Sequence, residues 1–600
     1  MRHFFLFSFF LFPLAFLILI IVYDKLDPIE KGLHSAISAD PARREVQGDV
    51  LESDETSIKG IPQRRQRSAC EMDEFVRYSR AELAEKDFFF SPARHPQGAH
   101  APVTERKYVL FGFDPGGFNN IRMAFEVAVV FAHASGRILV MPPKKRLYLL
   151  DKDPEEEDNK SGFEAYFDLE RLRGVLDIIS MEDFIRDVAV PGLLDMPWKQ
   201  EYSKSEEQLW RYLDKAAYMR EWEPGRFHIG FNLSVNNNTG GVDFGTFREK
   251  RHDLRQKLHG SHDRKLIHYN AAMHNHRAVY FPSGERGRLM KYRLITHFYS
   301  YIHFADPRLD RQYKRFVRDR IMYRPEIFCA AGRVVRLLRE EALAASIKRG
   351  HRHTIEGMPV GAARADTRGT YYAYHIRRGD FQYKATRLSG ATIWNNTKEL
   401  LDASISPIIY IATDEKDKRE FRDFKGGIDK LTLHPRFKVR YLRDYTERAL
   451  LGHSTGRMGP NWHGMIEQIV CASAHTFFGT PLSTFTGYIT RLRGYFHDNR
   501  YSRTLYFMPK HMYVLHSQVE LKGPFWSREF AVATEDIDDT VDGGMDEGAR
   551  LQRRVSRAHT QRLKYADKAG DLAQVLQLDV KLKDRKRRDV GKKVRRSRPM

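Results

Sequence analysis

One short stretch carries the charges best suited to hold a phosphate group. Residues 372–376 alternate large apolar side chains with smaller or polar ones, and the run breaks at Gly379. Four polar residues gather at its end: His375, Arg377, Arg378 and Asp380. Open α/β sheets bind ligands beyond the carboxyl ends of their strands, so these charges are predicted to face a ligand. Taken alone, the pattern is more typical of an ion pair at a strand end than of a ligand site.

An arginine in this position could grip a diphosphate. Its guanidinium presents a planar fork of donors that matches phosphate oxygens, and Asp380, three residues after Arg377, could orient that fork. The remaining segments of the chain must decide between a ligand site and a surface ion pair.

A glycine-rich turn stands near the start of the folded part. The strand pattern at 108–111 leads into Asp114-Pro115-Gly116-Gly117, then into a predicted helix from about Asn120 to Ala134, with Gly136 as its C-cap and a second strand at 137–141. This βαβ order predicts a parallel sheet. Paired glycines let the backbone approach an anion at a helix N-terminus, although they are also ordinary turn residues.

A second helix N-terminus follows a late strand. The strand pattern at 476–479 runs into Thr480-Pro481-Leu482-Ser483-Thr484-Phe485, which opens a helix predicted to reach Phe496. The hydroxyls of Ser483 and Thr484 could donate to a phosphate there, or simply cap the helix. Glu126, inside the first predicted helix, is interpreted as a residue reaching the protein edge rather than as a catalytic carboxylate.

Neither metal binding nor a disulfide scaffold is predicted. The Asp151-Lys152-Asp153 triplet lies in a solvated acidic run, and no Cys/His cluster has the spacing of a zinc site. The three cysteines allow at most one internal disulfide. The net charge of +22 owes much to a basic C-terminal tail, so no nucleic-acid partner is expected.

The N-terminus predicts a membrane anchor. Residues 4–22 are uncharged and almost wholly apolar, which is long enough to cross a bilayer, and no small-residue cleavage site follows. Arg2 on the short side places the N-terminus in the cytosol. The four sequons, at Asn159, Asn232, Asn237 and Asn395, fit a luminal body. A single-pass type II protein of the Golgi or endoplasmic reticulum is therefore expected.

Two domains are predicted between the anchor and the tail. The expected boundaries are a signal anchor at 1–23, a polar stem at 24–104, a first domain at 105–350, a second at 368–520 and a basic tail at 521–600. The stretch 198–265 reads as a polar insertion, and a helix from about Pro325 to Lys348 is expected to close the first domain. Further strands of the second domain are predicted at 408–412 and 439–441.

Taken together, these motifs resemble the GDP-fucose O-fucosyltransferase superfamily over roughly residues 107–500. The run from Gly116 to Arg122 looks like the Gly-Gly-x-Asn-x-x-Arg turn of the plant-type branch. The stretch from His375 to Asp380, the segment 139–148 and the run from Glu467 to Phe485 look closer to the enzyme that fucosylates thrombospondin type 1 repeats. The order and spacing of the motifs make this resemblance more specific than any one of them.

The resemblance implies an α/β fold of GT-B type, with two Rossmann-like domains facing a cleft, and inverting transfer of fucose from GDP-fucose without a required metal or cofactor. It implies that Arg377 binds the diphosphate and stabilises the departing GDP, positioned by Asp380 and His375. Nucleotide contacts are implied for the following residues: Glu467, Ser483, Thr484 and Phe485. The first-domain contacts implied are Gly117, Phe118, Asn119, Asn120 and Arg122.

The sequence departs from the family pattern at one position. The thrombospondin-repeat enzyme has a carboxylate as proposed base where this chain has Gly116, so the base is unassigned, with Glu126 a weak candidate. A protein or glycan hydroxyl is expected as the acceptor. Two alternatives stay open: a transferase of the same fold using another sugar nucleotide, and an inactive membrane-anchored protein that binds nucleotide sugars.

Overall fold

The structure, a computed structural model, describes part of the chain. The described residues are 102–145, 147, 150, 162–217, 227–231, 233–235, 242–244, 265–282, 301–304, 307–348, 369–430, 433–447, 460–495, 503–508 and 512–515. All of them fall in one compact unit, Ala69–Met600. The predicted anchor, acidic run and basic tail lie outside these ranges, as does the predicted stem except for residues 102–104. Among the described helices, none combines the length and apolar character needed to span a membrane.

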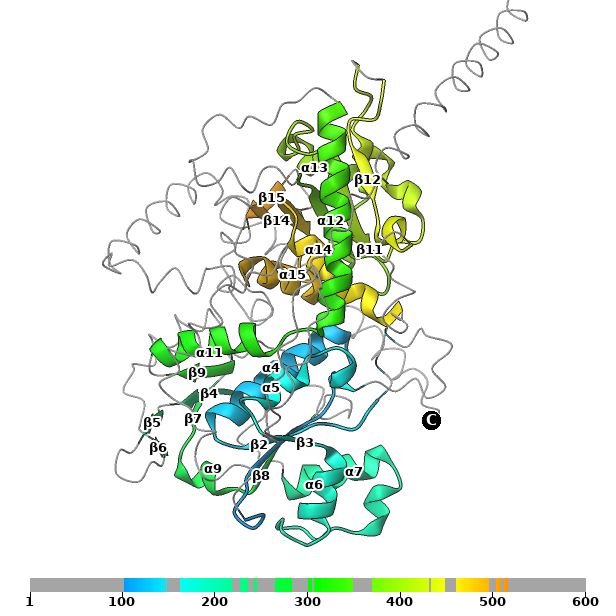
Figure 1. Cartoon of the computed structure of the whole chain (residues 1–600). Helices are drawn as coiled ribbons and strands as arrows, with labels where there is room; N and C mark the ends of the chain where they lie inside the picture. The colour runs from blue at the N-terminus through cyan, green and yellow to red at the C-terminus, as the bar shows by residue number, and fades with distance from the viewer. Residues whose placement is uncertain are drawn as a thin grey trace, which may run out of the picture. The chain divides into compact units, whose positions relative to one another are not determined.

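The first sheet has four parallel strands in the order β3-β2-β1-β8 (Figure 1). Its strands are β1 (Tyr108–Phe111), β2 (Ile138–Val140), β3 (Ile178–Ile179) and β8 (Ala278–Phe281). Alternate residues of β1 enter two different cores: Val109 packs on the side of α4 (Phe118–Ala134), and Leu110 on the opposite side. The predicted βαβ unit and parallel sheet are therefore present.

Helix α4 begins two residues earlier than the sequence predicted. Gly117 stands at its N-cap without a side-chain hydrogen bond, and the helix ends at Ser135. Gly136 follows in the left-handed region with φ of 63°, which glycine adopts without steric cost. The predicted C-terminal signal is confirmed.

The stretch 198–265 contains regular structure that the sequence prediction missed. Helix α7 (Glu206–Ala216) buries Trp210, Tyr212 and Leu213 under the first sheet, together with α6 (Met181–Phe184) and η4 (Ile185–Ala189). Strand β4 (Phe227–Phe231) pairs in parallel with β7 (Lys265–His268) and β9 (Ile302–Phe304). Charged residues between the apolar positions of α7 concealed its amphipathic pattern in the sequence. Because the stretch contains a packed helix and paired strands, it is not a plain polar insertion.

The second sheet has six strands in the order β12-β11-β10-β13-β14-β15. They are β10 (Tyr372–Ile376), β11 (Ile408–Thr413), β12 (Lys438–Arg440), β13 (Thr476–Gly479), β14 (Arg503–Met508) and β15 (Met512–Leu515). All neighbours pair in parallel except β14 with β15. The predicted α/β class with parallel sheets is confirmed.

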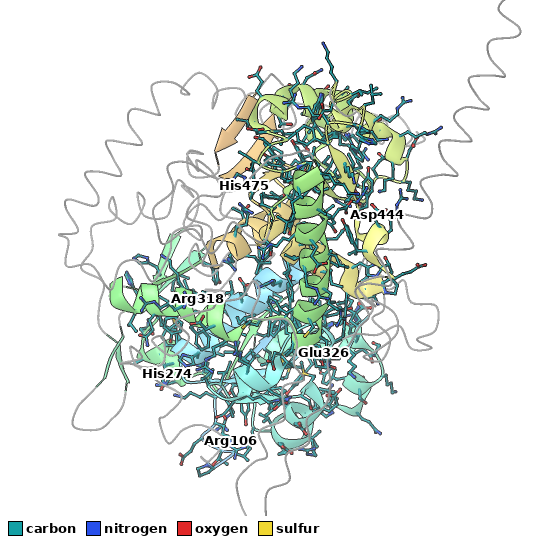
Figure 2. The ribbon with its side chains drawn as sticks, turned by 45° about the horizontal axis from the view of Figure 1, so that its top comes forward. Arg106, His274, Arg318, Glu326, Asp444 and His475 are labelled. Atoms are coloured by element: carbon teal, nitrogen blue, oxygen red, sulfur yellow. The ribbon has the colours of Figure 1, made fainter. Side chains whose placement is uncertain are left out.

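Helices cover both faces of the second sheet (Figure 1). On one face lie α12 (Pro325–Lys348), α14 (His463–Ala472) and α15 (Thr484–Tyr495). On the other, α13 (Gly390–Thr397) and the helical turn η11 (Lys418–Lys425) pack on Tyr374 and Ile376. In Figure 2, Asp444 and His475 mark the part that carries this sheet, and Arg106 and His274 the part that carries the first.

The remaining described elements are η3 (Phe163–Ala165), α5 (Leu169–Arg173), η5 (Gln200–Ser203), β5 (Leu233–Val235), β6 (Val242–Phe244), α9 (Ala271–Asn275), α11 (Pro307–Arg320), η9 (Lys384–Thr386), η10 (Lys398–Leu400), η12 (Leu442–Tyr445) and η13 (Pro460–Trp462). They are short, except for α11, which packs Tyr313, Phe316 and Val317 into the main core.

The helix predicted to close the first domain packs on the second sheet. Glu341 of α12 accepts hydrogen bonds from the Arg440 guanidinium and, at 2.7 Å, from the Tyr445 hydroxyl. These partners hold the pKa of Glu341 below its usual range despite its partial burial, because they favour its charged form. Cys329, on the same helix, is disulfide-bonded, whereas Cys471 of α14 is free and buried.

A buried arginine seals the end of α14. Arg493, 1% exposed, donates to the carbonyl oxygens of Ala474 at 2.6 Å and Ala472 at 3.0 Å, and also reaches His475. Burial lowers the pKa of Arg493 to about 10, yet it stays charged at neutral pH. It therefore satisfies carbonyls that the helix end leaves without partners.

We expect Arg493→Met to lower the free energy of unfolding by about 3 kcal/mol, because a charged donor is lost and several buried carbonyls stay unsatisfied. Arg419→Met, which removes an exposed ion pair with Asp417, should leave the free energy of unfolding nearly unchanged, because water and salt screen that pair. Urea denaturation of the two variants provides the comparison. Equal effects would contradict this account of Arg493.

Candidate functional site

The order of the second sheet creates a binding position between β10 and β13. The chain proceeds from β10 to β11 and β12 on one side, then returns to place β13 on the other. Such a reversal leaves a crevice at the carboxyl ends of the two central strands, where open α/β sheets bind ligands. Arg377 follows β10 and Thr480 follows β13, so both stand at this position. Tertiary structure thus supports the ligand interpretation of the stretch after 376.

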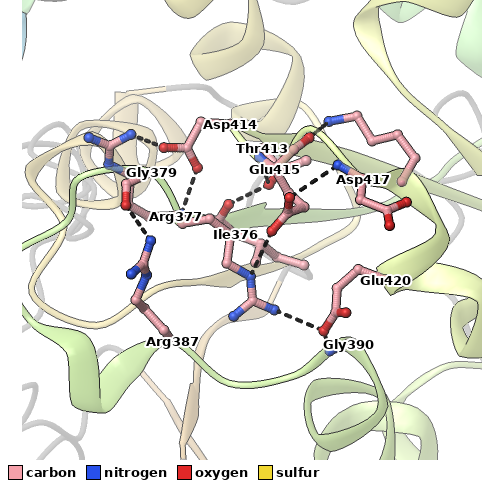
Figure 3. A network of polar contacts seen from close by, with 12 residues as sticks. Ile376, Arg377, Gly379, Arg387, Gly390, Thr413, Asp414, Glu415, Asp417 and Glu420 are labelled. Carbon is pink, nitrogen blue, oxygen red and sulfur yellow. Dashed lines mark hydrogen bonds and ion pairs between the residues drawn. The ribbon is translucent and has the colours of Figure 1, made fainter.

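Two carboxylates hold the Arg377 side chain. Its Nη2 lies 2.5 Å from Asp380 Oδ1. Its Nη1 contacts Asp414 Oδ2, as Figure 3 shows. Asp380 was predicted for this role, but Asp414, at the end of the neighbouring strand β11, was not. Because the guanidinium is held from two sides, it is oriented before any ligand arrives.

The backbone of the same stretch is also tied to both neighbouring strands. The Arg377 amide donates to Thr480 Oγ1 at 3.0 Å, and that hydroxyl donates to the His375 carbonyl at 2.9 Å. On the other side, the Arg378 amide donates to Asp414 Oδ1 at 2.6 Å. Position and direction of Arg377 are therefore both fixed.

The Arg378 side chain interacts with two glutamates that do not contact Arg377. Its guanidinium lies 3.9 Å from Glu415 and 3.7 Å from Glu420, and burial lowers its pKa. Because Glu420 belongs to η11, this arrangement gives Arg378 a role in holding η11 against the sheet. Of the two adjacent arginines, Arg377 is the one whose charge remains partly accessible.

Gly379 is required by the approach of Asp414 to Arg377. A Cβ atom built on Gly379 would overlap Asp414 Oδ2 and lie 3.1 Å from Arg377 Nη1. The glycine therefore serves close packing of the ion pair, whereas the sequence showed only a break in the strand.

We expect Gly379→Ala to displace Asp414 and reduce turnover about 10²-fold, the usual effect of misplacing a charge donor by about 1 Å. Gly174→Ala is the matched glycine control, because a Cβ atom there meets no neighbour closer than 3.5 Å and Gly174 lies at the end of α5, outside the candidate site. Thermal unfolding separates lost folding from lost alignment. Turnover of Gly379→Ala within threefold of wild type would contradict the packing argument.

His375 is a neutral, stacked side chain. Burial and the nearby Arg377 charge lower the pKa of His375 to about 3. Its Nδ1 lies 2.7 Å from Thr486 Oγ1, and its ring stacks on Phe485 at 4.4 Å between centroids. His375 thus supports the start of α15, and among the described contacts it does not hold the Arg377 guanidinium directly.

The segment between β13 and α15 is a tight turn. Leu482 has φ of 64°, a left-handed conformation that costs a leucine roughly 1–2 kcal/mol. Ser483, which follows it, is buried, while Thr484 begins α15 and is partly exposed. Strain at a non-glycine residue next to a helix N-terminus is typical of ligand-binding turns.

Glu467 of α14 lies near the same edge of the sheet. It is only partly exposed, and burial raises its pKa to about 8, with Asp414 adding to the rise and Lys418 opposing it. Glu467 is therefore protonated at neutral pH and can donate a hydrogen bond. This protonation state makes it a poor general base at neutral pH.

We expect the affinity for GDP to fall on the order of tenfold between pH 7 and pH 9. The reason is that the Glu467 carboxyl ionises over this range, and its negative charge then repels the diphosphate. Glu467→Gln should keep the pH 7 affinity and lose this dependence, since an amide also donates. Calorimetry at both pH values tests this. An identical pH dependence in Glu467→Gln and wild type would show that another group titrates.

The glycine-rich turn occupies the equivalent position of the first sheet. The order β3-β2-β1-β8 reverses between β1 and β8, and the turn follows β1. Gly117 has open space where a side chain would stand. A carboxylate is present in this turn, since Asp114 Oδ1 accepts from the Gly116 amide at 2.7 Å, but that bond serves the turn itself.

The predicted ligand residues of this turn divide into two groups. Asn120 keeps a buried Oδ1 without a described partner, whereas Asn119 bonds to Gln468 at 3.0 Å. Phe118 is packed against Tyr166 and Phe167 in the core. Gly117 and Asn120 are thus the members of this group that remain available.

Arg122 and Glu126 belong to a buried ion cluster rather than to an open site. Arg122 Nε lies 3.0 Å from Glu126 Oε1, and Arg491 of α15 contacts Glu126 Oε2. The Arg122 guanidinium also stacks on Tyr488 and Tyr323, 4.3 and 4.6 Å from their centroids. Glu126 is fully buried between two arginines, so this geometry does not offer it as a base, and it does not reach the protein edge as predicted.

Other candidate sites are weaker. Within the described ranges, no group of three His, Cys, Asp or Glu residues could hold a metal ion. A hollow of about 620 Å³ lies elsewhere, lined by Trp394, Phe437, Arg422 and Arg436 among others. None of the residues around Arg377 lines it.

Sequence reasoning missed three polar residues of this region: Asp414, Thr480 and Gln468. Asp414 carried a usable signal, because an acidic residue directly after a buried strand points to the carboxyl edge of a sheet. Gln468 carried none, since its partners lie far away along the chain.

Comparison with known proteins gives one extensive match. The family model described as "GDP-fucose protein O-fucosyltransferase" matches residues 108–496. No curated protein matches the sequence at a significant level. Similar solved structures include POFUT1 in complex with GDP, 12% identical, covering 67% of this chain and 98% of that chain with a TM-score of 0.30. Fucosyltransferase NodZ from Bradyrhizobium is 14% identical, covering 70% and 99%, with a TM-score of 0.31.

Proposed function

We propose that this chain, which belongs to the GDP-fucose protein O-fucosyltransferase family, transfers fucose from GDP-fucose to a hydroxyl group of a protein or glycan acceptor. Family membership confirms the resemblance found in the sequence and identifies the chain as a glycosyltransferase. The choice of GDP-fucose as the donor, the stereochemistry at C1 of the sugar and the class of acceptor are parts of this proposal.

The observation that carries the proposal is the doubly oriented guanidinium of Arg377 at the reversal point of the second sheet. In the proposed reaction, an acceptor oxygen forms a bond to C1 of fucose while the bond from C1 to the diphosphate oxygen breaks. The electron pair passes to the leaving GDP, and the acceptor proton is released. A fixed positive charge beside the diphosphate lowers the free energy of this step because charge develops there.

The start of α15 supports the same assignment. Its N-terminus follows Ser483 directly after β13, and free backbone amides at a helix N-terminus attract phosphate oxygens. Together with Arg377, they can neutralise a departing diphosphate, which supports a metal-independent reaction. We propose further that the two sheets are the two Rossmann-like domains of a GT-B enzyme, because each has the strand reversal of that unit.

The acceptor side is proposed to lie at the first-sheet turn around Gly117 and Asn120, with inversion at C1 and no assigned base. We also propose a luminal location in the Golgi or endoplasmic reticulum, with residues 4–22 as the anchor. Exposure of Asn395 on α13 is compatible with glycosylation there, as a luminal body requires. The other three sequons lie outside the described residues.

We expect Arg377→Ala to reduce turnover of GDP-fucose at least 10²-fold, as when one preorganised charge donor is removed. Arg377→Lys should recover only part of this loss, since an ammonium cannot keep both carboxylate contacts. Release of GDP measures turnover, and the mass of the acceptor measures transfer. Wild-type turnover in Arg377→Ala would show that the assignment is wrong.

The wild-type protein, offered GDP-fucose, GDP-mannose and UDP-sugars with protein and glycan acceptors, tests the proposal as a whole. If the protein transferred a sugar only from a nucleotide sugar other than GDP-fucose, the proposed donor would be wrong. Binding of GDP without transfer or hydrolysis on any acceptor would favour a binding protein and reject the enzyme.

A further inference from the structure

A buried amide links the two halves of the candidate site. Gln468 of α14 is 1% exposed. Its Nε2 donates to Asn119 Oδ1 at 3.0 Å and to the Phe485 carbonyl at 3.3 Å, and its Oε1 accepts from the Tyr323 hydroxyl at 2.6 Å. A carbonyl oxygen can only accept, so the Phe485 contact fixes which end of the amide is nitrogen.

The two acceptors of this amide stand at the starts of two different helices. Asn119 lies in the first turn of α4, directly after the glycine-rich turn. Phe485 lies in the first turn of α15, where its ring stacks on His375. Gln468 therefore connects the first-sheet turn to the helix start proposed to hold the diphosphate.

Further contacts join the same helices deeper in the protein. Arg122 stacks on Tyr488, and Glu126 contacts Arg491, so residue numbers rise together along α4 and α15. The helices thus run in the same sense, with both N-termini at the same end. The nearer of these two contacts, Arg122 on Tyr488, lies three residues beyond Asn119, roughly 4.5 Å along the helix, so Gln468 makes the described polar link to α15 that lies closest to the turn.

We propose that Gln468 is a positioning residue that holds the glycine-rich turn, Gly116–Asn120, against the nucleotide-binding end of α15. Through this amide, GDP bound on the second sheet orders the turn that faces the acceptor. The inference rests on the proposed function, because it assigns a nucleotide to α15. Gln468 touches no reacting atom, and its effect is on alignment, where an error of about 1 Å can cost about 10²-fold in rate.

A purely structural role would produce a different result. Burying a satisfied amide contributes to stability, and its loss would lower the melting temperature without changing turnover by folded protein. Tyr371→Phe is the matched control, because the Tyr371 hydroxyl makes a buried 2.6 Å hydrogen bond to the Val470 carbonyl of the same helix, with no link to the turn.

The test combines hydrogen exchange with kinetics on wild type, Gln468→Met and Tyr371→Phe. In wild type, GDP should slow exchange both at residues 376–380 and at the turn, 112–120. In Gln468→Met we expect the affinity for GDP to stay within about threefold of wild type. GDP should still slow exchange at 376–380 but no longer at 112–120. We expect kcat to fall about 10-fold to 10²-fold. Tyr371→Phe should keep both protections and wild-type kcat.

Three results would overturn the inference. Retained protection at 112–120 and wild-type kcat in Gln468→Met would leave Gln468 a purely structural role. Failure of wild type to bind GDP would reject the proposed function and the inference together, whereas GDP binding without protection at the turn would reject the inference alone. If Gln468→Met does not fold, Asn119→Ala removes the same hydrogen bond between Gln468 and the turn. It must then keep GDP protection at 376–380, lose it at 112–120 and lower kcat.

Discussion

The candidate site depends on one constraint, the position of β10 between β11 and β13. Because all three strands are parallel and in register, their carboxyl ends meet at one edge, and each neighbour places one polar group against the residue after β10. Asp414 comes from one side and Thr480 from the other. Neither contact is local in sequence, so the direction of Arg377 is a property of the assembled sheet rather than of its own segment.

The interior between the two sheets combines an apolar core with a few buried polar links. One continuous apolar cluster includes residues of both sheets, and its burial supplies the main driving force for their association. Ion clusters such as Glu126 with Arg122 and Arg491 add little net stability, because desolvation offsets their attraction. Their directional contacts instead determine which faces of α4 and α15 meet. These two helices follow the strand reversals of the two sheets.

The charges around the site are divided between holding and reacting groups. Arg378 is largely buried and lies within 4 Å of two glutamates, and His375 is neutral and stacked, so Arg377 is the more accessible positive charge of this stretch. Glu467 is protonated at neutral pH and does not add negative charge. An oriented guanidinium with a protonated glutamate near the same sheet edge suits the departure of a diphosphate better than proton abstraction from an acceptor.

The sequence by itself determined the α/β class, the strands and helices that flank the short motifs, and the pairing of Arg377 with Asp380, because hydrophobic period, turn residues and short motifs are local signals. It also determined the family. It missed α7, whose apolar positions stand among charges, and it allowed Glu126 two roles that the structure does not give it. Only the tertiary structure decided that Asp414 contacts Arg377 and that Gln468 joins Asn119 to Phe485, since long-range pairing leaves no trace in the spacing of residues.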